Sequence, residues 1–366
     1  MSITFCAGTA AELIKLAPLI GRSERTGTSW SAVFTGQAPK SFLVQWHDFG
    51  FDISRLTQLE IRDDDLSSSQ QAAAWMLRTG ARMVLPRRQH PAFASKGLWL
   101  VHGDTLSTLT GAILGRRLGV RVAHIEAGLR SNKMWDPFPE EICRKLVARI
   151  ATLHFAPERE AYNNLLNEGV RGDVEFTDGN TQIDAVLEAL ASVQGDAANS
   201  DTGYMLVNIH RFETMMSADR GAQVKEILRQ AASMHRLVIV SHATTQAWVD
   251  KDPSFKRELE MRGSQWLPRQ PFTRFVQWLV RAKGLISDSG GNQEECAMLG
   301  VPCLLLRHVT ERELPMDRTN VVLSQFRQDR VQPFLRDPAS YALPRRLLTD
   351  SPADKIFASL QKHLAT

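Results

Sequence analysis

Four consecutive residues, Asp288, Ser289, Gly290 and Gly291, are of types that could bind an anion. They follow a predicted buried strand and form a predicted tight turn before a helix expected over residues 292–299. Glycines in such a turn let backbone N–H groups approach a ligand closely, and the N-terminus of a helix favours a phosphate or a carboxylate. Ser289 could add a hydroxyl donor. The same pattern is also compatible with an ordinary capped turn that binds nothing.

The residues after this turn complete one unit of a parallel α/β fold. Glu294 and Glu295 lie in the first turn of the expected helix, where a carboxylate could accept hydrogen bonds from ribose hydroxyls. Gly300 marks the end of that helix, and an apolar strand is predicted over residues 301–306. Strand, glycine turn, helix and strand in this order predict half of a parallel α/β unit.

The same alternation runs through the whole chain. Strands are predicted over residues 3–7, 30–34, 98–102, 120–125, 153–156, 204–209 and 237–241, with helices between them. The predicted fold class is therefore α/β, with two Rossmann-like, doubly wound domains that face each other across a cleft. Ligands of such sheets bind beyond the carboxyl ends of the strands. The polar residues at those ends are Gly8-Thr9, Gly36-Gln37, Asp104, Glu126, His210, His242 and Ser289.

The length of 366 residues suits two domains of ordinary size. A polar stretch over residues 192–203 is the best candidate for a linker. We predict an N-terminal domain over residues 1–170 and a C-terminal nucleotide-binding domain over residues 171–350. A terminal helix over residues 351–366 is expected to pack back on the N-terminal domain.

Composition excludes several classes of partner. The formal charge of +4 is small and no basic run is interleaved with aromatic residues, so nucleic acid is not an expected partner. No apolar stretch is long enough to span a membrane, and no signal peptide is predicted. The cysteines are Cys6, Cys143, Cys296 and Cys303, and their scattered spacing predicts no metal site and indicates reduced thiols of a cytoplasmic protein.

Seven motifs in order resemble those of the non-hydrolysing UDP-N-acetylglucosamine 2-epimerases, over nearly the whole chain. They are His-Gly-Asp-Thr at 102–105, His-Ile-Glu-Ala-Gly-Leu-Arg at 124–130, Pro-Phe-Pro-Glu-Glu-Ile-Cys-Arg at 137–144, Asp-Gly-Asn-Thr-Gln-Ile-Asp at 178–184, Ile-His-Arg at 209–211, Asp-Ser-Gly-Gly with Gln-Glu-Glu at 288–295, and Thr-Glu-Arg with Thr-Asn at 310–320. The resemblance implies a two-domain fold like that of the B-type glycosyltransferases, a UDP-sugar substrate bound through the C-terminal domain, and a homodimer.

The resemblance also implies a reaction and the residues that carry it out. In that family UDP is eliminated to give a glycal, and UDP re-adds after a proton has reached C2 from the other face. No cofactor and no metal is needed. Asp104, Glu126 and Glu140 match the catalytic carboxylates of the family, and His210 matches its catalytic histidine. The residues expected to bind substrate are Lys15, Arg130, Arg144, Arg211, His242, Ser289, Gly290, Gly291, Glu295 and Arg312.

Several of these residues also fit a purely structural role. Asp104 could cap the helix that follows it, and Glu140 follows a proline at a helix start, where the helix dipole favours acids. His210 could be a buried core histidine. Arg144 lies one turn after Glu140, which predicts either a plain ion pair or a group that orients the acid. Glu126 has no evident capping role, so the catalytic interpretation is favoured there.

The chain departs from the family pattern at cationic positions. Ala10 stands where the family has an arginine that contacts the nucleotide, although Lys15 remains one turn along. Ala38 replaces a usual histidine in a region that bacterial members use for allosteric activation. Phe212 replaces a second arginine after His210-Arg211. Ala38 argues against such activation, and the two arginines lost at positions 10 and 212 predict an altered sugar nucleotide or an altered grip on UDP.

The expected activity is a non-hydrolysing UDP-N-acetylglucosamine 2-epimerase that supplies an N-acetylmannosamine-type precursor for a surface polysaccharide. Alternatives are an epimerase of another UDP-sugar such as a diacetamido uronic acid nucleotide, a hydrolysing epimerase, a UDP-sugar glycosyltransferase, and a non-catalytic UDP-sugar binder.

Overall fold

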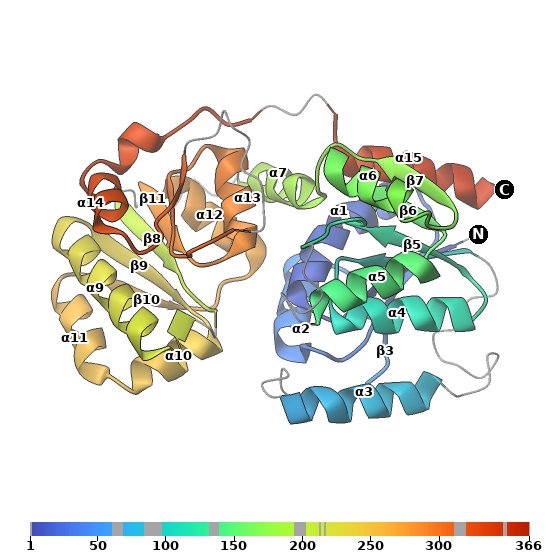
Figure 1. Cartoon of the computed structure of the whole chain (residues 1–366), viewed down its shortest axis with the longest axis horizontal. Coiled ribbons are helices and arrows are strands. Elements are labelled where there is room, and N and C mark those ends of the chain that lie inside the picture. Colours follow the sequence, from blue (N-terminus) through green and yellow to red (C-terminus); the bar gives the residue numbers. More distant parts are fainter. Residues whose placement is uncertain are drawn as a thin grey trace. The chain divides into compact units, whose positions relative to one another are not determined.

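The computed structural model describes residues 2–60, 69–83, 97–131, 139–193, 203–211, 214–215, 217–310, 320–346 and 350–365. The chain divides into two compact units (Figure 1). The first unit comprises Met1–Ala185 and Thr349–Thr366, and the second comprises Val186–Leu348.

The first unit is built on a seven-stranded, fully parallel sheet in the order β3-β2-β1-β4-β5-β6-β7. Its strands are β1 (Ser2–Ala7), β2 (Trp30–Phe34), β3 (Leu56–Gln58), β4 (Gly97–His102), β5 (Arg121–Ile125), β6 (Leu153–Ala156) and β7 (Asp173–Phe176). Its helices are α1 (Ala10–Arg25), α2 (Pro39–Asp48), η1 (Ile53–Arg55), α3 (Ser69–Met83), α4 (Leu106–Arg117), α5 (Glu140–Ile150), α6 (Arg159–Asn167), the first turn of α7 (Gln182–Val193), and α15 (Pro352–Ala365).

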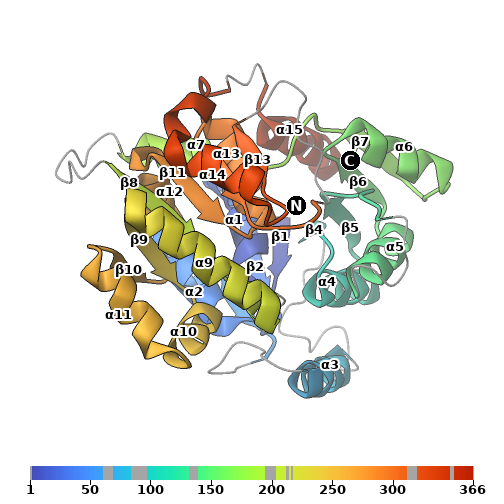
Figure 2. The ribbon, with the colours of Figure 1, turned by 60° about the vertical axis from the view of Figure 1, so that its left-hand side comes forward.

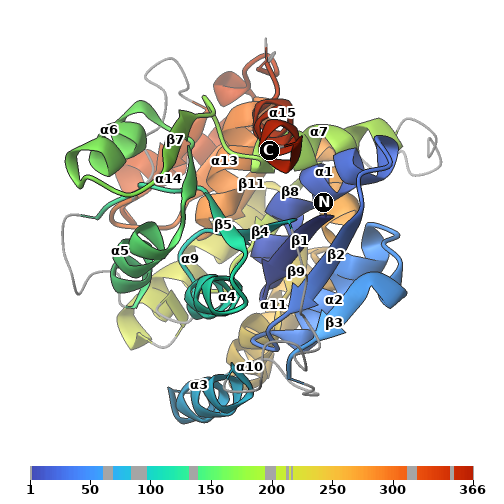
Figure 3. The same ribbon diagram turned by 90° about the vertical axis from the view of Figure 1, so that its right-hand side faces the viewer.

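Helices cover both faces of this sheet, as the side view in Figure 3 shows. On one face, α1, α2 and α15 bury Leu16, Trp46 and Phe357 against Phe5. The core of the other face contains residues of α4 and α5 packed against strand residues such as Trp99. Burying apolar side chains on both faces is what stabilises a parallel sheet.

The first unit extends beyond the domain boundary predicted at residue 170, because β7 pairs with β6 and belongs to the same sheet. Its C-terminal helix α15 is tied to α1 and α7 by polar contacts. Asp184 accepts hydrogen bonds from the hydroxyl of Ser351, from the backbone N–H of Ala353 (3.1 Å) and from Arg22 (3.3 Å). The linker predicted over residues 192–203 lies largely outside the described residues.

The second unit has a six-stranded parallel sheet in the order β10-β9-β8-β11-β12-β13. Its strands are β8 (Tyr204–Asn208), β9 (Arg236–Ser241), β10 (Gln265–Pro268), β11 (Gly284–Ser287), β12 (Cys303–Leu305) and β13 (Val321–Leu323). Its helices are the rest of α7, α9 (Ala218–Met234), α10 (Ala243–Asp250), α11 (Pro253–Met261), α12 (Phe272–Arg281), α13 (Gly290–Leu299), α14 (Gln328–Arg336) and η3 (Pro338–Tyr341).

Helices α9, α11 and α14 cover one face of the second sheet, and Figure 2 shows α9 lying along it. They bury Leu228, Phe255 and Phe334 against strand residues such as Val207. Both sheets therefore confirm the predicted α/β class. In each sheet, successive strands are added first on one side of the first strand and then on its other side. This switch lies between β1 and β4 in the first unit and between β8 and β11 in the second. Ligands of doubly wound sheets bind at this switch point.

Candidate active site

A buried carboxylate, that of Glu12, joins the two turns at the switch point of the first unit. Its Oε2 atom accepts hydrogen bonds from the backbone N–H groups of Gly8 (2.9 Å) and Thr9 (2.8 Å), after β1. Its Oε1 atom accepts from the hydroxyls of Thr105 (2.8 Å) and Thr108 (2.9 Å), after β4. Burial raises the pKa of Glu12, and these donors oppose that rise. The network fixes the turn between β4 and α4 against the start of α1.

Asp104 lies in that turn and is held by Arg144 of α5. The Nε and Nη2 atoms of Arg144 lie 2.9 Å and 2.5 Å from Oδ2 of Asp104, and its Nη1 atom lies 3.3 Å from Oε2 of Glu141. Burial disfavours the charge of Arg144, but Asp104 and Glu141 outweigh it and raise the pKa of the guanidinium. The arginine predicted to bind substrate therefore also orients a predicted catalytic acid.

The helix that carries Glu140 presents two acids with different surroundings. Glu140 is the first residue of α5 and is half-buried. Glu141 is buried, and its Oε2 atom accepts from the backbone N–H (3.0 Å) and the hydroxyl (3.2 Å) of Ser131. Glu141, to which the sequence had assigned no role, thus forms an ion pair with Arg144 one helical turn along α5.

Glu126 forms the centre of a second cluster, just after β5. Its backbone has a φ of 62°, in the left-handed region that side chains other than glycine rarely adopt. Its Oε2 atom accepts hydrogen bonds from the Nζ atom of Lys15 and from the Nδ2 atom of Asn180, and lies 3.5 Å from Nε2 of the buried His102. One carboxylate oxygen thus lies against three nitrogen groups from α1, β4 and the start of α7.

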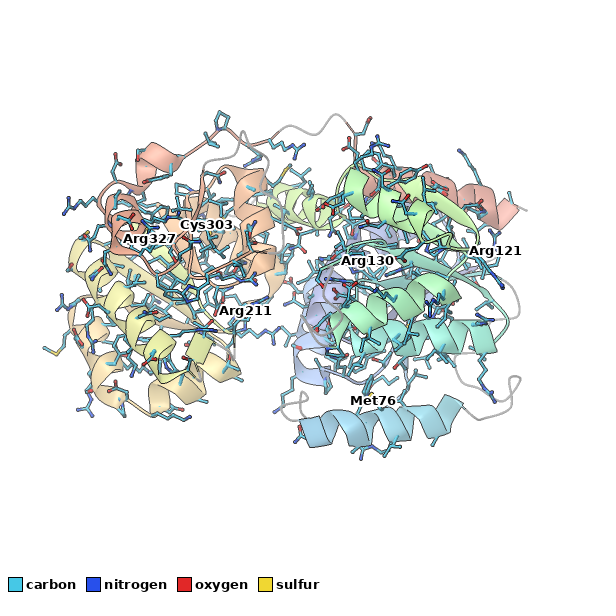
Figure 4. The ribbon with its side chains drawn as sticks, viewed as in Figure 1. Met76, Arg121, Arg130, Arg211, Cys303 and Arg327 are labelled. Carbon is cyan, nitrogen blue, oxygen red and sulfur yellow. The ribbon has the colours of Figure 1, made fainter. Side chains whose placement is uncertain are left out.

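Arg130, predicted to bind substrate, is engaged by protein groups (Figure 4). Its Nε and Nη2 atoms each lie 2.7 Å from an oxygen of Glu168, and its Nη1 atom donates to the carbonyl of Leu129 at 2.7 Å. In the part of the chain that the structure describes, this guanidinium forms an ion pair with Glu168 and contacts the carboxylate of neither Glu126 nor Asp104.

In the second unit, the side chain of Asp288 joins the ends of β11 and β8, the two strands at the switch point. Its side chain is fully buried at the end of β11, and its two oxygens accept from the backbone N–H groups of His210 (3.1 Å) and Arg211 (2.9 Å), after β8. Figure 4 labels Arg211 at this strand end. A charge-assisted pair of this kind fixes the backbone that presents both predicted residues.

His210 and His242 lie side by side at the ends of neighbouring strands, with ring centroids 4.6 Å apart. The Nε2 atom of His242 lies 2.8 Å from Oδ1 of Asn208. Burial, together with His210 and Arg269, lowers the pKa of His242 to about 3. Burial also lowers the pKa of His210, an effect that Asp288 opposes. Both rings are therefore neutral near pH 7.

The glycine turn differs from its prediction. Helix α13 begins at Gly290, so Gly290 and Gly291 are its first two residues rather than part of a turn before Asn292, and neither has a positive φ. Ser289 is the N-cap, and its side chain makes no capping bond. The first N–H groups of an α-helix have no partner within the helix, and glycine leaves them uncovered by a Cβ, which preserves the predicted anion-binding character of this end.

Two further predicted binding residues have different outcomes. Glu295 is buried, and its Oε2 atom accepts from Nδ2 of Asn292 at 2.7 Å, so the structure gives it an internal role at the base of α13. The oxygen of Asn292 in turn accepts from Asn208 (2.7 Å) and Ser287 (2.8 Å), which ties α13 to β8 and β11. Arg312 and Phe212 lie outside the described residues.

A family model described as UDP-N-acetylglucosamine 2-epimerase matches residues 23–344 of the chain. The chain belongs to this family of epimerases. A UDP-N-acetylglucosamine 2-epimerase of Methanocaldococcus jannaschii is 29% identical over 323 residues, which cover 85% of each chain. The family is one of isomerases, and its reaction class fits a site that gathers carboxylates and cations at strand ends.

Two solved epimerase structures have the same fold. A structure of the Methanocaldococcus jannaschii enzyme in complex with UDP-GlcNAc and UDP has a TM-score of 0.74 at 25% identity, and the match covers 99% of this chain and 100% of that one. An enzyme from Neisseria meningitidis bound to UDP-GlcNAc has a TM-score of 0.75 at 25% identity, with coverage of 99% and 100%.

Among the residues of this epimerase that the structure describes, no group of three or more His, Cys, Asp or Glu side chains could hold a metal ion. Across the same residues, no helix has both the length and the apolar character needed to cross a membrane.

Sequence reasoning on this epimerase missed the partners that hold its site together. Glu141 and Asn180 were present in the motifs and Glu12 follows the first predicted strand, but none of the three had an assigned role. For Glu12 a signal existed, because Thr9 and Glu12 have the spacing of a capping box, which the structure confirms. No comparable local signal marks the contact of Asn180 with Glu126, 54 residues earlier.

Proposed function

We propose that this epimerase interconverts UDP-N-acetylglucosamine and UDP-N-acetylmannosamine without net hydrolysis. The observation that carries the proposal is the placing of two carboxylates, Asp104 and Glu126, against Arg144 and Lys15 at neighbouring strand ends of the first unit. Relatives of the same fold bind UDP-GlcNAc. Acids and bases of this kind are what proton transfer at a sugar carbon requires.

The proposed reaction has two balanced halves. A base removes the C2 proton, the C1–O bond breaks with its electron pair leaving on UDP, and a C1=C2 double bond forms. In the second half UDP adds back to C1 while C2 receives a proton on the opposite face. The ring ends with the inverted configuration at C2, and no redox partner is consumed.

The first unit is proposed to supply the proton transfers. The ammonium group of Lys15 against Glu126 favours the ionised carboxylate, as a base requires. Asp104, held by Arg144, and Glu140 at the start of α5 are the other proposed acid–base groups. His210, neutral near pH 7, is the group proposed from the second unit. The assignment of individual groups to the two faces of C2 is left open.

The second unit is proposed to hold UDP. The uncapped N-terminus of α13 at Ser289, Gly290 and Gly291 offers backbone N–H groups to a diphosphate. Arg211, fixed through its backbone by Asp288, offers a cation beside it. Glu295, His242 and Arg312 remain proposed UDP-site residues. Glu295 and His242 would act through Asn292 and Asn208, which their side chains contact.

A product analysis tests this proposal. Purified protein is incubated separately with UDP-GlcNAc and with UDP-ManNAc, and products are separated by anion exchange. We expect the same mixture of both UDP-sugars from either side, with negligible free UDP. Stoichiometric release of UDP with free N-acetylmannosamine would instead establish a hydrolysing enzyme, and no conversion from either side would reject UDP-GlcNAc as substrate.

One observation favours a second candidate, an epimerase of a different UDP-sugar such as a diacetamido uronic acid nucleotide. Ala10, where the family pattern has a nucleotide-contacting arginine, is the buried first residue of α1 and brings no cation to the turn after β1. Conversion of that nucleotide, but not of UDP-GlcNAc, would support this candidate. For either substrate we propose a homodimer that supplies a surface polysaccharide precursor from the cytoplasm.

A further inference from the structure

We propose that Asn180 is a positioning residue for the catalytic carboxylate of Glu126. The inference rests on the proposed function, in which Glu126 transfers a proton at C2. The side chain of Asn180 does not itself react. Its loss would change the protonation and the orientation of the Glu126 carboxylate.

The segment before Asn180 has a fixed and unusual backbone path. Asp178 has a φ of 57° and Gly179 a φ of 136°, both outside the range that most side chains adopt. The hydroxyl of Thr177 donates to the carbonyl of Gly179 at 2.8 Å, and the N–H of Gly179 donates to the carbonyl of Pro157 at 2.8 Å. Asn180 is therefore presented by a braced turn at the carboxyl end of β7.

The two ends of the Asn180 amide have different partners. Its Oδ1 atom accepts the backbone N–H of Gln182, the first residue of α7, at 3.2 Å, and the hydroxyl of Thr181 lies 3.5 Å away. A backbone N–H can only donate, so the amide oxygen must face α7. The amide nitrogen is then directed at Glu126, to which it donates. The helix start thus fixes which end of the amide meets the carboxylate.

The carboxylate that receives this amide is constrained from several sides. Its Oε2 atom contacts Lys15 and Asn180 and lies 3.5 Å from His102. The left-handed backbone of Glu126, with a φ of 62°, sets where the side chain leaves the strand end. Hydrogen bonds to the charged form of a carboxylate favour that form. Asn180 therefore donates a hydrogen bond from a neutral group. This bond holds the carboxylate oxygen in place and leaves its ion pair with Lys15 intact.

Two substitutions separate capping of α7 from contact with Glu126. Asn180→Asp keeps an acceptor for the N–H of Gln182 but places a second negative charge against Glu126. Asn180→Ser also keeps a capping oxygen but has no donor that reaches as far. The matched control is Asn163→Asp, at an exposed position of α6.

Two quantities are measured in each variant. One is the rate of C2 proton exchange. The other is the titration of the Glu126 carboxyl, which is followed by ¹³C NMR and assigned with Glu126→Gln. For Asn180→Asp we expect kcat to fall by roughly 10²-fold with a nearly unchanged KM. We also expect the carboxyl to titrate at higher pH than in the wild type, because a like charge disfavours ionisation. Asn180→Ser should shift both in the same direction by less. Asn163→Asp should leave both unchanged.

A wild-type kcat and an unshifted titration in Asn180→Asp would overturn the inference while leaving the proposed function intact. If the wild type itself exchanges no C2 proton, the proposed function fails, and the titration alone then decides whether Asn180 controls the charge of Glu126. Wild-type kcat and wild-type titration in both variants, each of which keeps a capping oxygen for the N–H of Gln182, would reduce Asn180 to a cap of α7.

Discussion

The Nζ atom of Lys15 and the carboxylate of Glu126 form a buried ion pair between residues 111 positions apart in the chain. The exposed fractions of the two side chains are 10% and 7%. A charge this far removed from water is costly unless its partner is present. The pair therefore links the first helix of the protein to the carboxylate that follows β5, and each residue depends on the other for its charge.

Lys15→Met should abolish most of the activity. Without the ammonium group, Glu126 loses the partner that keeps it ionised, and we expect C2 exchange to fall by roughly 10²–10⁴-fold. Unfolding by urea should show a loss of up to about 3–5 kcal/mol if the carboxylate stays charged. The matched control is Lys225→Met in α9, which breaks a more exposed pair with Asp252 and should cost about 1 kcal/mol or less. Equal activity of Lys15→Met and wild type would contradict the assigned role.

Glu12→Gln should destabilise the first unit. An amide can accept hydrogen bonds at only one of its two ends, so either the N–H groups of Gly8 and Thr9 or the two threonine hydroxyls would face an NH₂ group. We expect a loss of about 1–3 kcal/mol in the free energy of unfolding. Glu24→Gln, at an exposed position of the same helix, is the control. A loss no larger than that of the control would mean that the Glu12 network contributes little.

Arg144→Lys should impair catalysis more than folding. Arg144 donates to Asp104 through two nitrogens and to Glu141 through a third, and a lysine has only one nitrogen for these tasks. A misplaced Asp104 should lower kcat by roughly 10²-fold. Arg149→Lys, on an exposed position of the same helix, should be silent in the same assay. Full activity with Lys at position 144 would show that Asp104 needs no fixed partner.

Stability should fall in mild acid because of buried histidines. Burial lowers the pKa of His124 to about 3, and its Nε2 atom contacts the carbonyl of Gly103 at 2.8 Å. The unfolded chain binds a proton near pH 6.5 and the folded protein does not, so this contribution is present above pH 6.5 and is lost as pH falls toward 3. Between pH 7 and pH 5 the loss for this residue is about 2 kcal/mol.

The check compares urea unfolding at the two pH values in wild type and in His124→Gln, which retains a donor for Gly103. The decrease from pH 7 to pH 5 should be smaller by about 2 kcal/mol in the variant, whatever its stability at pH 7. His47→Gln, at an exposed position, should keep the wild-type decrease. An identical decrease in all three proteins would mean that His124 is protonated in the folded state.

Local sequence patterns predicted the main elements and the strand ends. The predicted strands over residues 30–34 and 153–156 are confirmed as β2 and β6 to the residue, because apolar runs bounded by turn residues are strong signals. The four edge strands were missed: β3 (Leu56–Gln58), β7 (Asp173–Phe176), β10 (Gln265–Pro268) and β13 (Val321–Leu323). Each has three or four residues and is at most partly buried, so none carries a periodic pattern long enough to detect.

The contacts within the site could not be predicted in the same way. Sequence placed Asp104 and Glu126 at strand ends, but their partners Arg144, Lys15 and Asn180 come from other elements of the chain. Spacing along one helix placed Glu140 and Arg144 on one face of α5, but it gave no sign that Arg144 would also contact Asp104, which follows β4. Tertiary packing decides such pairs, and no local rule fixes it.

Proton NMR of UDP-GlcNAc incubated with the protein in D₂O tests the central claim most directly. Removal and return of the C2 proton must exchange it with solvent. We expect deuterium at C2 in a manno product that is still linked to UDP, and none when Glu126→Gln is used. A C2 proton that stays fully retained in both UDP-sugars, under conditions in which UDP binds, would contradict the account.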